Sequence, residues 1–201
     1  MHFYFKRKGF KIYNIRLIFA LLAILTGLSG NAQKSSNFQF DLGLTQNYNG
    51  FFKLFNGILD LGAGYNHELA KDFYGGFHFR MSFLNREGTT NRATVYKPGI
   101  NLHYYINLSD QLALIPVASL GYAILDLSNK EFNYRETQAG WNPGAEVRML
   151  WKREKKLDFY VFGRFDYVHL SRDEDFTLLE DYRDVYLSSF GLGLRLKSNH
   201  P

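Results

Sequence analysis

Apolar and polar residues alternate along most of the chain after residue 33. In the segment FHFRMSF (77–83), for example, every second residue is apolar and the residues between them are His, Arg and Ser. A period of two is typical of a β-strand that has one apolar face. The same pattern predicts eight strands, over residues 38–45, 58–68, 77–83, 99–108, 112–125, 143–151, 157–170 and 186–196.

The connections between these strands alternate in length. Three are short, at 69–73, 108–111 and 152–156, and three longer polar connections lie at 85–94, 128–140 and 171–184. Short turns at one end and long loops at the other, with an even number of antiparallel strands, form the pattern of a bacterial transmembrane barrel. We therefore predict an all-β fold, an eight-stranded antiparallel up-and-down transmembrane β-barrel. Pro116 lies inside the fifth strand and is expected to cause a β-bulge.

The polar face of the predicted strands carries four acids and four arginines in mid-strand. They are Asp41, Asp60, Arg80, Glu146, Arg148, Arg164, Asp166 and Arg195. An Arg turned to lipid at the midplane costs about 2–4 kcal/mol, so we expect this face to point into the lumen. Eight strands leave a lumen just wide enough for side chains to fill it. We predict that Arg–carboxylate pairs close the lumen. Lysines lie in turns, loops or strand ends, with Lys97 as the nearest exception.

The same period of two also fits a different class of protein. A secreted, soluble lipocalin-like barrel has eight strands as well, but it turns its apolar face inward and binds a small apolar ligand there. This barrel remains the alternative fold.

The first 32 residues differ from the rest of the chain. They contain five basic residues and no acidic residue, the apolar run LIFALLAILTGL (17–28), and the ending Gly30-Asn31-Ala32. This is the organisation of a cleaved signal peptide, and the run is too short for a membrane-spanning helix of about 20 residues. We predict a signal peptide at 1–32 and a barrel domain at 33–201. Without the signal, 19 Lys and Arg balance 19 Asp and Glu, so the net charge of +5 does not indicate a nucleic-acid partner.

With these features the chain resembles the small OmpA/OmpX-like outer-membrane barrels of Gram-negative bacteria. The resemblance covers residues 38–196. It includes the closing strand SSFGLGLRL, which looks like the C-terminal signal for the outer-membrane assembly machinery, although the chain continues through KSNHP. It implies a monomer in the outer membrane that contacts lipid and lipopolysaccharide and has no cofactor. The implied role is structural or interactive, with the loops 85–94, 128–140 and 171–184 available to an external partner.

One group of residues suggests an enzyme. His169 and Ser171 share a face of a predicted strand, and Glu174 or Glu180 follows as an acid to orient the imidazole. This resembles the His-x-Ser site of outer-membrane lipid A deacylases, but Arg172 stands where that family is expected to have Asn, and both acids lie in a loop. We therefore predict a non-enzymatic protein, with a lipid A hydrolase as the alternative.

The sequence offers little for a metal ion. His78 and His103 share the inner face of neighbouring predicted strands, but no third ligand accompanies them, and the chain has no cysteine. We predict that both histidines form hydrogen bonds in the lumen and that there is no metal site.

Overall fold

The computed structural model describes residues 35–48, 55–129, 131, 133–152, 156–171 and 183–198. Within these ranges no helix is long and apolar enough to cross a membrane. The described residues form nine strands: β1 (Ser36–Asn47), β2 (Phe55–Ala70), β3 (Phe73–Arg86), β4 (Asn91–Tyr104), β5 (Ile106–Asn107), β6 (Leu112–Asn129), β7 (Tyr134–Trp151), β8 (Leu157–Leu170) and β9 (Asp184–Ser198).

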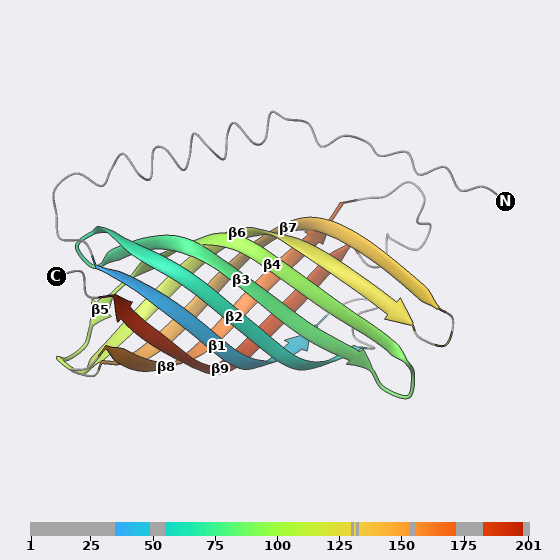
Figure 1. Ribbon diagram of the computed structural model, residues 1–201, viewed down its shortest axis with the longest axis horizontal. Coiled ribbons are helices and arrows are strands. Elements are labelled where there is room, and N and C mark those ends of the chain that lie inside the picture. Colours follow the sequence, from blue (N-terminus) through green and yellow to red (C-terminus); the bar gives the residue numbers. More distant parts are fainter. Residues whose placement is uncertain are drawn as a thin grey trace, which may run out of the picture. The chain divides into compact units, whose positions relative to one another are not determined.

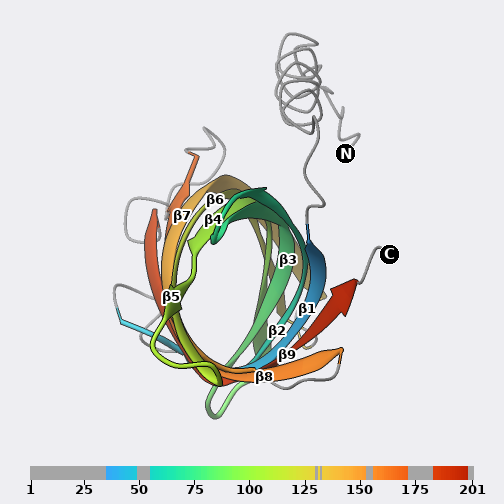
Figure 2. The same cartoon turned by 90° about the vertical axis from the view of Figure 1, so that its left-hand side faces the viewer.

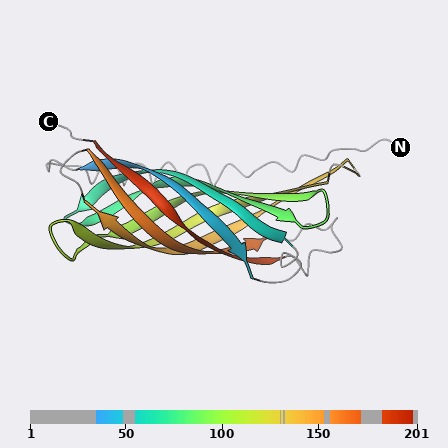
Figure 3. The same cartoon turned by 90° about the horizontal axis from the view of Figure 1, so that it is seen from below.

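These strands form one antiparallel sheet that closes on itself (Figures 1 and 2). The first strand, β1, pairs with both β2 and β9, which lie on either side of it in Figure 3. The two-residue strand β5 continues β4 beyond Tyr105, because both pair with β6 in the same register. The nine strands therefore occupy eight positions around the barrel, and the predicted eight-stranded up-and-down barrel is confirmed.

Side chains alternate between the outside and the lumen of the barrel. On β1, Leu42 and Leu44 are 56% and 70% exposed, whereas Gln39, Asp41 and Thr45 are buried. The same alternation runs through the neighbouring strands, so the outer surface is a band of apolar side chains and the charged positions point inward. This is the orientation predicted from the cost of placing Arg in lipid.

Near the loop end of the barrel the inward-facing residues are apolar and the outward-facing residues are polar, which is the reverse of the arrangement in the middle of the barrel. On β4, Ala93 and Val95 are buried inside the barrel, whereas Arg92 is exposed outside it. Because this inversion keeps the period of two, the strands continue through segments whose composition is polar. The loops predicted at 85–94 and 128–140 are therefore wrong, since the strands leave only residues 87–90 and 130–133 as connections.

The other connections match the predictions more closely. The turn predicted at 108–111 is confirmed, and the connection predicted at 152–156 is the one between β7 and β8, of which residues 153–155 lie outside the described residues. The connection between β8 and β9 covers 171–183, and most of it lies outside the described residues. The predicted signal peptide at 1–32 also lies outside them, so it stays a prediction.

Proline fits this barrel without a bulge in the strand that carries it. Pro98, Pro116 and Pro143 all face outward. The bulge expected at Pro116 is wrong, because β6 keeps one register with β4 and β5 on both sides of it. The ladder is interrupted there instead, and the N–H of Tyr105 donates to the carbonyl of Asp72 in the β2–β3 turn (2.8 Å).

An arginine on the outer band tests its contact with lipid. We expect Leu192→Arg, at a position 64% exposed on β9, to lower the free energy of unfolding by about 2–4 kcal/mol in lipid vesicles. The measurement is urea unfolding followed by tryptophan fluorescence. Gln46→Arg, at the exposed loop end of β1, is the matched control and should change stability by less than about 1 kcal/mol. Equal effects of the two variants would contradict the lipid-facing assignment.

Candidate functional site

The lumen holds three successive layers of side chains. Along β8 the inward residues are first Phe162, then Arg164 and Asp166, and then Val168. The apolar layer near the loops consists of Phe55, Leu84, Ala93, Val95, Ala123, Leu125, Val168, Leu170, Val185 and Leu187. The layer near the short turns consists of Tyr105, Ala113, Ile115, Val117, Leu150, Tyr160 and Phe162. Charged side chains fill the space between them.

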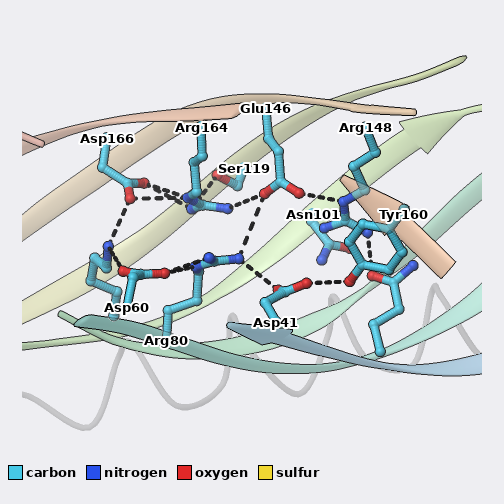
Figure 4. A network of polar contacts seen from close by, with 12 residues as sticks. Asp41, Asp60, Arg80, Asn101, Ser119, Glu146, Arg148, Tyr160, Arg164 and Asp166 are labelled. Atoms are coloured by element: carbon cyan, nitrogen blue, oxygen red, sulfur yellow. Dashed lines mark hydrogen bonds and ion pairs between the residues drawn. The ribbon is translucent and has the colours of Figure 1, made fainter. Parts of the chain in front are cut away.

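Six charges of alternating sign form a closed ring in the middle layer, and Figure 4 labels all of them except Lys97. In order around the ring they are Arg80, Asp60, Lys97, Asp166, Arg164 and Glu146. The Nζ atom of Lys97 lies 3.2 Å from Asp60 Oδ2 and 2.8 Å from Asp166 Oδ2. Lys97 therefore joins the carboxylate of β2 to that of β8 across the lumen.

The arginines complete the ring through both ends of their guanidinium groups. Arg164 lies 2.8 Å from Asp166 Oδ1, and its Nη1 donates to Glu146 Oε2 at 3.1 Å. Arg80 Nε donates to Asp60 Oδ1 at 2.9 Å, and Arg80 Nη1 lies 3.7 Å from Glu146 Oε2. Planar guanidinium groups suit such double contacts, because their donors lie in a fixed fork.

Two further charges extend the ring toward the short turns. Asp41 Oδ2 accepts a hydrogen bond from Arg80 Nη1 at 2.6 Å, and the hydroxyl of Tyr160 donates to Asp41. Arg148 donates to both Glu146 and the side chain of Gln39. The network thus contains four cations and four anions, and none of the eight residues is more than 9% exposed.

The structure brings seven of the eight predicted residues into this network. The exception is Arg195, which pairs with Asp158 nearer the short turns and lies over the ring of Tyr105, 5.2 Å from its centroid. The network contains Lys97 instead, which the sequence analysis set apart because most lysines lie in turns and loops. The alternation of the sequence contains the signal for its position. Lys97 stands an even number of residues from Asn101 and His103, which point inward on the same strand.

In both lumen histidines, His78 and His103, the ring nitrogen Nδ1 is buried without a hydrogen-bond partner among the described residues. His103 Nε2 lies 2.8 Å from Asn101 Oδ1, so one ring nitrogen is hydrogen-bonded. No cluster of three or more His, Cys, Asp or Glu side chains suited to a metal occurs among the residues that the structure describes.

The enzyme-like residues lie on the outer face at the loop end. His169 Nδ1 is 2.7 Å from Asp184 Oδ1, on the neighbouring strand β9, and the same oxygen accepts a hydrogen bond from Tyr167 at 2.6 Å. Ser171 is exposed just beyond β8, and no described contact joins its hydroxyl to His169.

The acid that contacts His169 is thus Asp184, which is not one of the acids predicted from the sequence. Glu174 and Glu180, the acids considered there, lie outside the described residues. The alternating pattern predicts that the last strand begins at residue 186. It therefore leaves out Asp184, which is the first residue of β9.

An eight-position antiparallel barrel with an apolar outer band and a filled, charged lumen defines a small transmembrane β-barrel protein. The sequence matches the outer membrane protein β-barrel domain family over residues 19–197, and the chain belongs to this family. Membership places the protein in the outer membrane, as predicted, and argues against the soluble lipocalin-like alternative. A comparison with curated proteins gives no match.

Solved structures of outer-membrane proteins have a similar fold. Neisserial surface protein A (NspA) has a TM-score of 0.64 at 11% identity, covering 83% of this chain and all of its own. Ail of Yersinia pestis, in complex with the heparin analogue sucrose octasulfate, has a TM-score of 0.55 at 12% identity, with 83% and 100% coverage. OprG of Pseudomonas aeruginosa has a TM-score of 0.51 at 10% identity, with 84% and 99% coverage. At these identities the likeness shows the fold alone.

Removing one charge from the ring tests its energetic weight. We expect Asp166→Asn to lower the free energy of unfolding by about 3–5 kcal/mol, because Lys97 and Arg164 each lose a partner inside the lumen. The measurement is urea unfolding of the folded barrel in vesicles.

The matched control is Asp126→Asn, which breaks the ion pair with Arg135, a side chain that is 73% exposed. This change should cost about 1 kcal/mol or less, since exposed pairs contribute little. If Asp166→Asn lowers the free energy of unfolding no more than Asp126→Asn does, the ring contributes no more to stability than an exposed ion pair.

Proposed function

We propose that the protein is a monomeric, non-conducting scaffold of the outer membrane. The observation that carries this proposal is the lumen, in which a neutral network of eight buried charges lies between two apolar layers. Water-filled porins need about 16–18 strands, whereas this barrel has eight strand positions filled by side chains. The function then rests on the rigid barrel and on the surfaces that it presents.

The proposed role is to support the membrane or to bind a partner at the cell surface. The β8–β9 connection, residues 171–183, is the longest at the loop end and the leading candidate for that contact. The fold that this chain shares with Ail, whose structure holds a heparin analogue, supports a surface interaction without identifying its partner. Contacts with lipopolysaccharide, and recognition of the closing strand by the assembly machinery, belong to the same proposal, which requires no enzymatic step.

Electrical recording tests the closed lumen. The expected result is that the purified protein, inserted into planar bilayers in concentrated KCl, gives no stepwise conductance, because the side chains of three layers fill the lumen. A sixteen-stranded porin recorded under the same conditions is the positive control. Reproducible steps that increase in number with added barrel would overturn the non-conducting role.

One observation favours a second candidate function, hydrolysis of an ester in the outer leaflet. The contact of Asp184 with His169 Nδ1 leaves His169 Nε2 as the nitrogen available to accept a proton. Ser171 lies two residues further along. A nucleophile, a base and an orienting acid in this order are the components of hydrolase triads.

A comparison of lipid A from cells tests this second function. The hydrolase predicts that cells expressing the wild type lose acyl chains from lipid A, as measured by mass spectrometry. Ser171→Ala and His169→Asn should both prevent the loss, whereas Ser128→Ala, at the same end of the barrel, should not. Identical lipid A in all four strains would exclude the hydrolase and leave the scaffold role unaffected.

A further inference from the structure

The barrel closes where its first strand, β1, pairs with its last strand, β9, over residues 36–47 and 187–198. We call this strand pair the seam. Its two strands are not consecutive in the sequence, so their pairing is what turns the sheet into a barrel. On the inner face of β9 the seam has Gly191 and Gly193 at two successive inward positions. The space over these glycines is taken by side chains of another strand, β8.

Tyr160 of β8 lies across Gly193 and reaches β1. In the register of the sheet Tyr160 pairs with Gly193, which pairs with Asp41. The ring of Tyr160, which is 1% exposed, occupies the place where a Cβ atom on Gly193 would lie. Its hydroxyl donates a hydrogen bond to Asp41 Oδ1 (Figure 4). A side chain of β8 is thus bonded to a strand that is not its neighbour in the sheet.

Phe162, the next inward residue of β8, makes the same crossing one row nearer the loops. It pairs with Gly191, which pairs with Gly43 of β1. Its Cζ atom lies 3.0 Å from the position that a Cβ atom on Gly43 would take, so this ring also extends over β9 to β1. Glycines inside strands often mark places where another group approaches closely, and here they leave room for both rings.

We propose that Tyr160 and Phe162 form a seam latch, which holds β1 against β9 from inside the barrel. The latch engages only when β1 has paired with β9, because both rings reach β1 across the glycines of β9. It therefore opposes reopening of the closed seam. Arg80 Nη1 donates to the other carboxylate oxygen of Asp41 at 2.6 Å, so the latch also joins the seam to the charge ring. This role concerns closure of the barrel and does not depend on conductance or on a surface partner.

Gly193→Ala disengages the latch, because the added methyl group needs the place of the Tyr160 ring. We expect this variant to unfold about tenfold faster than the wild type in lipid vesicles with urea, since a methyl group forced into a packed core displaces its neighbours. Unfolding is followed as the loss of the band whose gel mobility changes on boiling. The matched control is Gly163→Ala, where a Cβ atom would face outward and meet only the side chain of Phe190, at 3.3 Å. It should unfold at nearly the wild-type rate.

A crosslink across the seam separates a latch from ordinary packing. The chain has no cysteine, so Leu42→Cys and Leu192→Cys, an outward pair on β1 and β9, can be joined by a short bismaleimide. Because the linker keeps the seam closed, Gly193→Ala should then unfold at the rate of the crosslinked parent. The matched control is a linker between Leu61→Cys and Met81→Cys, an outward pair on β2 and β3. With this linker Gly193→Ala should keep its full effect.

Tyr160→Phe tests the latch without the added methyl group and serves if Gly193→Ala does not fold. It keeps the ring and removes the hydrogen bond to Asp41, so unfolding should become several-fold faster, and only the seam linker should abolish this increase. An unfolding rate that neither variant changes would overturn the latch. So would an effect that both linkers remove, or that neither removes, because the two rings would then stabilise the barrel as a whole rather than its seam.

Discussion

The closed ring of six alternating charges in the lumen is the interaction on which the rest of the barrel depends. Each member is removed from water, where a lone charge would be very costly, and each contacts two opposite charges. The six side chains come from two groups of consecutive strands, β2 to β4 and β7 to β8, so the ring forms only when these strands are in register. A slip of one residue in any of these strands would turn the charges of that strand to lipid. Replacing buried ion pairs by apolar groups is often neutral or stabilising, and we therefore infer that this ring serves to specify the register.

The apolar layers on both sides strengthen the ring by keeping water from it. Aromatic residues contribute directly, since the guanidinium groups of Arg80 and Arg148 lie 4.9 and 5.1 Å from the ring centroids of Phe162 and Tyr160. The lumen is therefore a packed core with a polar centre. Its packing continues to the loop end, where the strands extend past the outer apolar band and keep their inner face apolar.

A filled lumen leaves the outer surface and the connections as the places where this protein can act. The pair of His169 and Asp184 lies on the outer face at the loop end, and an apolar groove beside Trp151 lies on the outer face at the end with short turns. Both sites consist of side chains that face lipid or the headgroup region, so they lie on the outer surface of the barrel. This arrangement follows the general rule that a fold does not by itself imply a function, which resides in the sites that the fold carries.

The period of two predicted the number of strand positions and their order, and the cost of charge in lipid predicted the face that meets lipid, because alternation and charge are local properties of the chain. It also placed seven of the eight network residues on the inner face. Only the tertiary structure decided which charges meet. Lys97 joins the ring and Arg195 does not, since partners are set by the stagger between strands that are distant in sequence. The strand ends were likewise decided in three dimensions: polar segments such as 91–95 remain strands because their inward side chains pack across the lumen, which no local pattern records.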